Sequence, residues 1–293
     1  MRDELSQPVY GPFPIETIVE IDPGARDELA RVTRDILPVE DSHLREPSIQ
    51  RSLSVELSRG FAEWRDLAQR IASTARSHGF ALVRGLNFDE ENRLSAGLTA
   101  GFATIVEPYT EPYAKVVREI GVRPGVETLH TDGTGWVVPN DLTLLECVEP
   151  DPAGGGASLL SRVDDAINLL THEQSTIEVL TRETAPFMVD TELGGGVKYL
   201  HILTIDPQTG RYSVQFHSYD TDNLVAKGAD IKPIVKEAMK RFEASLDSPS
   251  VCRQQLMTKG DWLIVDNHHT LHARTAVQMP STRLLKRIKA NWQ

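Results

Sequence analysis

The hydrophobic pattern of the chain changes near residue 110, from long helical periods to short strand-like runs. In the first part, residues 23–40 and 57–79 carry apolar side chains at the spacing of amphipathic helices, and the stretch between them, up to residue 50, is expected to be irregular. The second helix is expected to end at Gly79, because glycine commonly terminates helices in a left-handed conformation. Residues 89–105 begin with acidic side chains, as a helix N-terminus prefers, and predict a further helix.

Beyond residue 110, short apolar runs are separated by Gly, Pro and Asp. Many short strands with turn signals between them favour a sandwich or jelly roll over alternating βαβ units. Two helical stretches, residues 164–183 and 230–248, interrupt the strands and are expected to pack outside them. The pattern therefore predicts a mainly β protein with flanking α-helices. The expected strands lie within residues 80–88, 142–148, 157–163, 186–191, 198–206, 211–218, 252–258, 261–267, 271–277 and 284–292.

No internal repeat, low-complexity tract or Pro/Ser-rich linker divides the chain. A sandwich or barrel with additional elements often reaches this length of 293 residues as one unit. We expect a single domain over residues 1–293. In it, a mostly helical lead-in, residues 1–105, would pack on a β core, residues 106–293, that contains a helical insertion.

Composition and net charge indicate which kinds of binding partner the protein is expected to have. Hydrophobic residues make up 40% and charged residues 25% of the chain, as in an ordinary globular protein. The net charge of −11, from 42 Asp and Glu against 31 Lys and Arg, argues against nucleic acid and anionic membranes as partners. The start of the chain lacks a signal-peptide pattern and no apolar run approaches the roughly 20 residues that span a bilayer, so a cytoplasmic location is expected. A small molecule is the expected partner, and the sequence leaves the oligomeric state open.

Cys147 and Cys252 are far apart in the sequence and neither belongs to a CxxC pair. This pattern favours two buried, reduced thiols over a disulfide framework or a thiolate zinc site. The chemistry of the protein must therefore come from other side chains.

Residues 127–136, "ETLHTDGTGW", place His130 and Asp132 one residue apart. In extended backbone, positions i and i+2 project to the same side, so both groups would face one point. The pair alone is weak evidence, because an isolated His-x-Asp is more often a partly buried histidine near a turn. A metal site needs a third ligand.

The histidine cluster near the C-terminus, His268, His269 and His272, offers that ligand. A helical zinc motif fits poorly, because the Glu of H-E-x-x-H is missing and the flanking residues are β-like. His272, at the start of an expected strand, is the better candidate. Two imidazoles and one carboxylate on one face of a metal, with open positions opposite, form the arrangement of non-heme Fe(II) oxygenases.

The order of these residues resembles the Fe(II)/2-oxoglutarate dioxygenases and, among them, the taurine dioxygenase and clavaminate synthase-like branch. His130-x-Asp132 is followed about 140 residues later by His272, and then by Arg283 and Arg287. Other segments resemble the branch in the same order, so the resemblance covers most of the chain. These segments are "HGFALVRGL" (78–86), "GGGASLL" (154–160) and "DWLIVDNHHTLHART" (261–275), similar to the lead-in strand, the Gly-Gly segment and the "DN…LHGR" segment.

The resemblance implies a double-stranded β-helix, or jelly roll, decorated by helices, and implies that Fe(II) is held by His130, Asp132 and His272. It implies 2-oxoglutarate as co-substrate, with an arginine and a hydroxyl on its distal carboxylate; we expect these to be Arg283 and Ser158, because a planar guanidinium binds a carboxylate through two parallel hydrogen bonds. The implied reaction uses O2 to hydroxylate an unactivated C–H and yields succinate and CO2. Desaturation and cyclisation are variants of the same chemistry.

Arg287 lies four residues after Arg283, and in a regular strand it would face the same side. In taurine dioxygenase-like relatives such an arginine holds an anionic group of the substrate, so a small anionic or amino-acid-like metabolite is expected. A solvated surface arginine is the alternative for Arg287. Trp136, four residues past Asp132, and His269, which stands where relatives commonly carry arginine, are further candidates for contacting the substrate.

Two other classes stay open at this point. A jelly-roll metallohydrolase or isomerase could use the same ligands with zinc or manganese to activate water, and Arg283 and Ser158 would then have no role. A cupin-like protein could bind a metabolite without turning it over.

Overall fold

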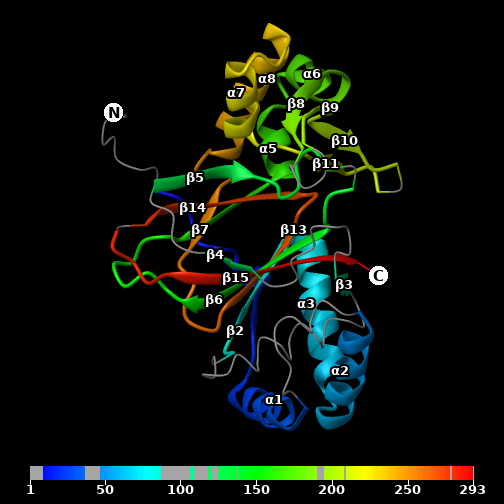
Figure 1. The fold of residues 1–293 in the computed structure, drawn as a ribbon, viewed down its shortest axis with the longest axis vertical. Helices are drawn as coiled ribbons and strands as arrows, with labels where there is room; N and C mark the ends of the chain where they lie inside the picture. The colour runs from blue at the N-terminus through cyan, green and yellow to red at the C-terminus, as the bar shows by residue number, and fades with distance from the viewer. Residues whose placement is uncertain are drawn as a thin grey trace.

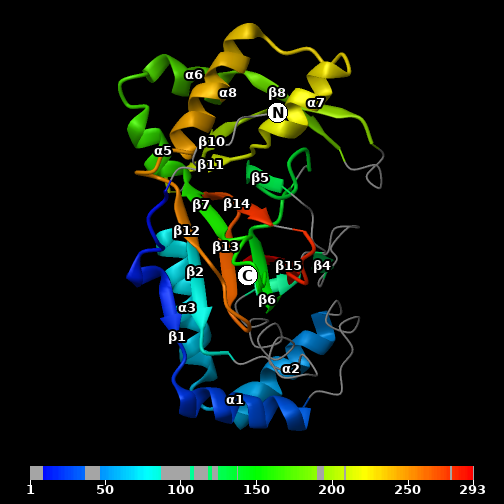
Figure 2. The same ribbon diagram turned by 90° about the vertical axis from the view of Figure 1, so that its left-hand side faces the viewer.

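The computed structural model describes residues 9–36, 47–86, 106–108, 118–120, 125–136, 138–189, 195–207, 209–277 and 279–292. Two β-sheets lie in the middle of the molecule, with α1, α2 and α3 at one end and α5 to α8 at the other (Figure 1). The perpendicular view shows the same order of layers (Figure 2).

The described helices carry the labels of Figure 1. They are η1 (Ile15–Thr17), α1 (Pro23–Ile36), α2 (Pro47–Gly60), α3 (Trp64–His78), α5 (Val163–Leu169), α6 (Gln174–Arg182), α7 (Ser218–Ala226) and α8 (Pro233–Leu246). The strands are β1 (Ile18–Glu20), β2 (Phe80–Arg84), β3 (Val106–Pro108), β4 (Arg118–Ile120), β5 (Gly125–His130), β6 (Leu142–Glu149), β7 (Ser158–Arg162), β8 (Thr184–Met188), β9 (Val197–His201), β10 (Leu203–Ile205), β11 (Tyr212–Val214), β12 (Arg253–Gln255), β13 (Trp262–Asp266), β14 (Thr270–Val277) and β15 (Leu284–Trp292).

The larger sheet has seven strands in the order β1-β2-β13-β6-β15-β3, with β4 also paired to β15. The smaller has four strands in the order β12-β7-β14-β5. Within both sheets every pairing is antiparallel except that of β1 with β2. The apolar run of β13 is buried at all five positions, because this strand is flanked by β2 and β6 and covered on both faces.

Three apolar clusters hold these layers together. One joins the outer face of the large sheet to α1, α2 and α3, and α3 contributes Trp64, Leu67, Ala68 and Ile71 at helical spacing. A second lies between the two sheets and includes Leu263 of β13. The third joins the small sheet to α5, α6 and α8. Strand alternation sends neighbouring side chains of the large sheet to different clusters, so both of its faces are covered.

The predicted helix over residues 57–79 is wrong in its first part. A helix already runs from Pro47 to Gly60, and α3 begins only at Trp64. The break falls where α1 crosses, because a Cβ on Gly60 would lie 2.6 Å from Val32 Cγ1. The end of α3 agrees with prediction, since Gly79 adopts a left-handed φ of 83°.

Most predicted strands are present, but the helical segments differ in detail. Residues 164–183 form two helices, α5 and α6, instead of one, while residues 230–248 contain α8 as predicted. Helix α7 was not expected; it begins after His217, whose side chain accepts a hydrogen bond from the backbone N–H of Asp220. The predicted helix at residues 89–105 lies outside the described residues.

Both cysteines are free and buried, as the sequence predicts. Burial raises the pKa of the Cys147 thiol to about 12 and that of Cys252 to about 11, so neither is a reactive thiolate at neutral pH. In the described part of the chain, no helix combines the length and apolar character needed to cross a membrane.

Candidate metal centre and active site

Strand pairing brings two distant histidines together at the end of the small sheet. Strands β5 and β14 run antiparallel, and the Cα of His130 is paired with that of His272. Their imidazole rings lie with centroids 4.5 Å apart. Both side chains are buried, so the sheet register places them as direct cross-strand neighbours.

Asp132 lies in the turn that follows β5, beyond the end of the strand. The side chain of Asn267, after β13, holds this turn: its Oδ1 accepts from the Asp132 backbone N–H at 2.8 Å, and its Nδ2 donates to the Asp132 carbonyl at 3.0 Å. The same amide donates to the carbonyl of Asn140. Asp132 is therefore positioned by a side-chain clamp, and not by the alternation of an extended strand on which its prediction rested.

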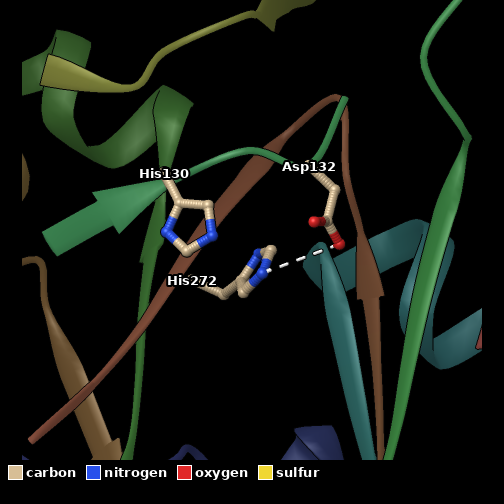
Figure 3. A group of neighbouring side chains, drawn as sticks. All are labelled: His130, Asp132 and His272. Atoms are coloured by element: carbon tan, nitrogen blue, oxygen red, sulfur yellow. Dashed lines mark ion pairs between the residues drawn. The ribbon is translucent and has the colours of Figure 1, made fainter. Parts of the chain in front are cut away.

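The three predicted ligands form one buried group. His130, Asp132 and His272 each offer a ligand atom, and these atoms lie within 4.8 Å of one another. Figure 3 shows the imidazoles and the carboxylate turned toward a common point, with Nε2 of His272 3.9 Å from Oδ2 of Asp132. Among the described residues, this is the one group of His, Cys, Asp and Glu with a geometry that could hold a metal ion.

The other two histidines of the C-terminal cluster point elsewhere. Nε2 of His268 lies 2.9 Å from Oδ1 of Asp141. Nδ1 of His269 lies 2.9 Å from Oδ2 of Asp266. Of the three histidines, His272 alone joins His130 and Asp132, as the sequence favoured.

The protonation states suit a divalent metal. The backbone carbonyl of Thr128 lies 2.8 Å from Nδ1 of His130, which favours a proton on that nitrogen and leaves Nε2 as the lone-pair donor. Burial, followed by the charge of His130, lowers the pKa of His272 to about 3, so its ring is neutral. Nδ1 of His272 is buried without a hydrogen-bond partner. Neutral imidazoles and an ionised carboxylate are the donor set that Fe(II) takes in oxygenases.

The Asp132 carboxylate is surrounded by cations and a hydroxyl. Thr143 Oγ1 donates to Oδ2 at 2.7 Å, while Arg287 Nη1 donates to Oδ1 at 2.8 Å and Lys289 Nζ lies 3.4 Å from Oδ1. Burial alone would raise the pKa of Asp132, but the charges of Arg287 and Lys289 hold it well below the usual value. The carboxylate is therefore ionised at any working pH.

Arg283 is buried but does not share the surroundings of Arg287. It precedes β15, and the register shift at Leu284/Leu285 breaks the regular alternation that the sequence argument assumed. Its Nη2 donates to the carbonyl of Gly156 at 3.0 Å, and a Cβ on Gly156 would lie 2.5 Å from Arg283 Nε. The glycine segment predicted to precede Ser158 therefore leaves room for the Arg283 guanidinium.

Ser158 lies near the same place in the small sheet. Its Cα is paired with that of Arg274, two residues past His272, and its hydroxyl donates to Met257 Sδ at 3.4 Å. Burial, followed by the charge of Arg274, lowers the pKa of Arg283. Arg283 bonds to Gly156, two residues before Ser158, so the two residues lie near each other.

A cavity of about 360 Å³ opens beside the ligand group. Trp136, predicted to line it, does so, whereas His269 is absent from its wall and is bound to Asp266. The geometry thus gives His269 no substrate contact in this cavity. The walls of the cavity include His130, Asp132, Trp136, Met188, Asp220 and Lys289.

Several residues of the site were missed by sequence reasoning. Lys289 could have been found, since it lies two residues after Arg287 and the same strand alternation applies to both. Thr143 and Asn267, which bond to Asp132, were missed as well. His217 was expected from the sequence to be a supporting group and not a ligand, and its ring centroid lies 4.8 Å from that of His130. Contacts of this kind depend on strand register, and no local pattern signals them.

The jelly roll of two facing sheets, with two histidines and a carboxylate at its end, defines the class of non-heme iron oxygenases. The comparisons with known proteins agree. The profile of the "Taurine catabolism dioxygenase TauD, TfdA family" matches residues 43–289, and the chain belongs to this family.

Clavaminate synthase 2 of Streptomyces clavuligerus is 26% identical over 288 residues, covering 85% of this chain and 84% of that protein. A solved asparagine oxygenase in complex with Fe(II), hydroxyasparagine and succinate superposes with a TM-score of 0.73 at 17% identity, over 93% of both chains. The non-heme iron oxygenase OrfP in complex with Fe gives a TM-score of 0.70 at 18% identity, again over 93% of both chains. These two structures share the fold of this protein.

Family membership makes this protein an Fe(II)/2-oxoglutarate-dependent oxygenase, with Fe(II) as cofactor and 2-oxoglutarate and O2 as co-substrates. The family match confirms the resemblance to the taurine dioxygenase and clavaminate synthase-like Fe(II)/2-oxoglutarate dioxygenases that the sequence indicated. The metallohydrolase and the non-catalytic cupin-like protein are correspondingly disfavoured.

Proposed function

We propose that this oxygenase hydroxylates an unactivated C–H of a small, anionic, amino-acid-like metabolite, and that His130, Asp132 and His272 hold the iron. The observation that carries the proposal is the buried ligand group, with its donor atoms within 4.8 Å of one another, beside a cavity of metabolite size. Two arginines and a lysine, Arg283, Arg287 and Lys289, are buried or half-buried in the neighbouring strand region.

The bound iron supplies the oxidation: 2-oxoglutarate and O2 react to give succinate and CO2, and one oxygen atom enters the substrate. The residues of the chain contribute ligation, orientation and a dry site. Thr143 fixes one oxygen of Asp132, and the Thr128 carbonyl fixes the tautomer of His130. Both contacts orient the ligands before the metal arrives.

Arg283 is proposed to bind the distal carboxylate of 2-oxoglutarate, with the Ser158 hydroxyl beside it. Support comes from its burial, from the space that Gly156 leaves for its guanidinium, and from its place on the chain after His272. A guanidinium that is permanently charged and planar suits a carboxylate held at its other end by a metal.

Arg287 is proposed to bind an acidic group of the substrate. It reaches Asp132, which lines the cavity, and its side chain keeps 21% exposure. Trp136 forms part of the wall that excludes water. The similar asparagine oxygenase and OrfP structures were solved with hydroxyasparagine and dihydroxyarginine bound, which supports an amino-acid-like substrate here.

We further propose that residues 1–293 work as one catalytic domain. The lead-in contributes β1 and β2 to the large sheet, where β2 pairs with β13. Removing the lead-in would expose that edge and the apolar cluster beneath α3, so the β core is not expected to fold without it.

The test measures succinate formed from 2-oxoglutarate under air, with Fe(II) and a panel of amino acids, and records the mass of each product. We expect a gain of one oxygen atom in the product and succinate in equal amount. Asp132→Asn keeps the shape of the ligand but removes its charge and should reduce both products to background. Loss of two hydrogens without oxygen gain would show desaturation instead, and wild-type turnover by the variant would show that Asp132 is not a ligand.

A further inference from the structure

Asp151 is a buried acidic residue in the loop between β6 and β7. It lies two residues after the end of β6, and only 5% of it is exposed. Its Oδ2 accepts from the backbone N–H of Gly155 at 3.0 Å, and its backbone carbonyl accepts from the N–H of Gly154 at 2.9 Å. Both bonds hold the glycine segment that precedes β7 against Asp151.

The other carboxylate oxygen of Asp151 reaches the segment before β15. Ser281 Oγ donates to Asp151 Oδ1 at 2.7 Å, and the same hydroxyl oxygen accepts from the backbone N–H of Arg283 at 3.1 Å. A serine hydroxyl can donate one hydrogen bond while it accepts others. Ser281 therefore connects the Asp151 carboxylate to the backbone of Arg283, across 130 positions of the chain.

Both segments that Asp151 holds lead to Arg283. The guanidinium Nη2 donates at 3.0 Å to the carbonyl of Gly156, the residue that follows Gly155. The approach at Gly155 is close, because a Cβ there would lie 2.5 Å from Asp151 Oδ2. Hydrogen bonds and the chain connect these residues into one ring: Asp151, Ser281, Arg283, Gly156 and Gly155. The two oxygens of one carboxylate thus support both the backbone and the guanidinium of Arg283.

A carboxylate suits this position better than an amide does. Oδ1 accepts from Ser281 and also from the backbone N–H of Ala153 at 3.4 Å, while Oδ2 accepts from Gly155. An ionised carboxylate accepts through both oxygens, whereas an asparagine would direct an NH2 group at one of these donors. An amide could therefore hold the glycine segment or Ser281 well, but not both.

We propose that Asp151 is a positioning residue for the binding of 2-oxoglutarate, and that it acts by fixing Arg283 from two sides. This inference rests on the role of Arg283 proposed above. Arg283 keeps further N–H groups for a carboxylate while Nη2 is bonded to Gly156. Without Asp151, the guanidinium would have to be ordered when the co-substrate binds, and that ordering would cost affinity.

A double-mutant cycle between Asp151 and Arg283 tests the inference. 2-Oxoglutarate is titrated calorimetrically, under anaerobic conditions, into the Fe(II)-loaded wild type, Asp151→Ala, Arg283→Gln and the double variant. We expect Asp151→Ala to weaken 2-oxoglutarate binding by about tenfold, because buried hydrogen bonds to a charged group are lost. In the Arg283→Gln background the same change should weaken it by less than about twofold, because Asp151 acts through the guanidinium that is already absent.

Two milder variants grade the effect. Asp151→Asn keeps one accepting oxygen, and Ser281→Ala breaks the connection to the Arg283 backbone alone, so each should weaken binding by less than Asp151→Ala does. If Asp151→Ala does not fold, as judged by circular dichroism, Asp151→Asn takes its place in the cycle. Asp27→Ala, which removes an exposed carboxylate on α1, is the control and should bind 2-oxoglutarate as the wild type does.

Affinity for Fe(II) in the absence of 2-oxoglutarate distinguishes positioning from general damage. Anaerobic titration of Fe(II) into chelator-treated protein should give the wild-type affinity in every Asp151 variant. The reason is that Asp151 supports the glycine segment and Ser281, whereas Asn267 holds the turn of Asp132. A purely structural role of Asp151 would weaken the binding of both ligands.

The outcomes separate the two proposals. If Arg283→Gln binds 2-oxoglutarate as tightly as the wild type, the proposed role of Arg283 has failed and this inference fails with it. If Arg283→Gln weakens binding, but the Asp151 variants bind as the wild type or the two effects multiply in the double variant, only the role of Asp151 is overturned. Equal losses of Fe(II) and 2-oxoglutarate affinity in the Asp151 variants would overturn it as well.

Discussion

Arg283 and Arg287 are separated by four residues, yet their guanidinium groups have different neighbours. Arg283 is bonded to the Gly156 carbonyl, and Arg287 is bonded to the carboxylate of Asp132. A guanidinium bonded to a backbone carbonyl keeps other donors for an incoming carboxylate, because it carries five N–H groups. The two residues are therefore expected to act on different ligands.

Arg283→Gln should raise the KM for 2-oxoglutarate by about tenfold or more, since charge-assisted hydrogen bonds contribute about 1.5–3 kcal/mol. Arg287→Gln is the matched control and should mainly raise the KM for the amino-acid substrate. Succinate formation measured against each concentration separately gives both values. If the effects are exchanged between the variants, the proposed roles of the two arginines are exchanged as well.

At the scale of elements, most of the strands could be predicted from the alternation of apolar and polar residues and from the turn residues between them. The bounds of β6, β13, β14 and β15 agree to about one residue with the runs that the alternation and the turn residues delimit. The pairing of β5 with β14 brings the predicted ligands His130 and His272 together. The helix boundaries were less predictable: the break at Gly60 depends on close contact with α1, which no local pattern reveals.

Asn267 shows why part of the site could not be read from the sequence. It lies at the end of the expected strand over residues 261–267, and its amide holds the backbone of Asp132, 135 positions away. The contact between Asn267 and Asp132 forms because the β13–β14 turn packs against the turn after β5. No local sequence pattern indicates that these two turns are in contact.

Asn267→Ala should weaken Fe(II) binding by about 10- to 100-fold, as loss of groups that orient metal ligands typically does. Asn168→Ala, at an exposed position of α5, is the control and should leave the affinity unchanged. Anaerobic titration of Fe(II) into chelator-treated protein measures the effect. Equal affinity in the Asn267→Ala variant and the wild type would mean that the clamp does not position Asp132.

A histidine–aspartate contact links the β13–β14 turn to the C-terminal strand. His268 bonds to Asp141 Oδ1, and Asp141 Oδ2 accepts from the Trp292 backbone N–H at 2.9 Å. Burial alone would lower the pKa of His268, but the hydrogen bond and charge of Asp141 raise it above the usual value. Protonation of His268 therefore stabilises the folded state.

Because the folded pKa of His268 is raised, its contribution is fully present below the unfolded value of about 6.5 and is lost as pH rises through the folded value. Wild type should exceed His268→Gln in unfolding free energy by about 1 kcal/mol at low pH, and by less at alkaline pH. Urea unfolding with chelator present, at about pH 6 and about pH 9, measures both differences. A difference that grows with pH would contradict the assignment.

At the scale of the whole molecule, the site lies where the two sheets and the helical insertion meet. Asp132 and His272 belong to the small sheet and its turn, Arg287 and Lys289 to the large sheet, and Asp220 to the insertion. The resemblance to the family predicted this convergence for the iron ligands. That Lys289 and Asp220 line one cavity required the structure, because the insertion and the large sheet come together only in the folded chain.

The central claim is that His130, Asp132 and His272 bind the iron. Crystals grown anaerobically with Fe(II) and 2-oxoglutarate, measured at the iron absorption edge, test it most directly. The account predicts one anomalous peak at bonding distance from both imidazoles and the Asp132 carboxylate, with 2-oxoglutarate extending toward Arg283. Iron bound at His268 or elsewhere, or a peak that leaves His272 outside bonding distance, would contradict it.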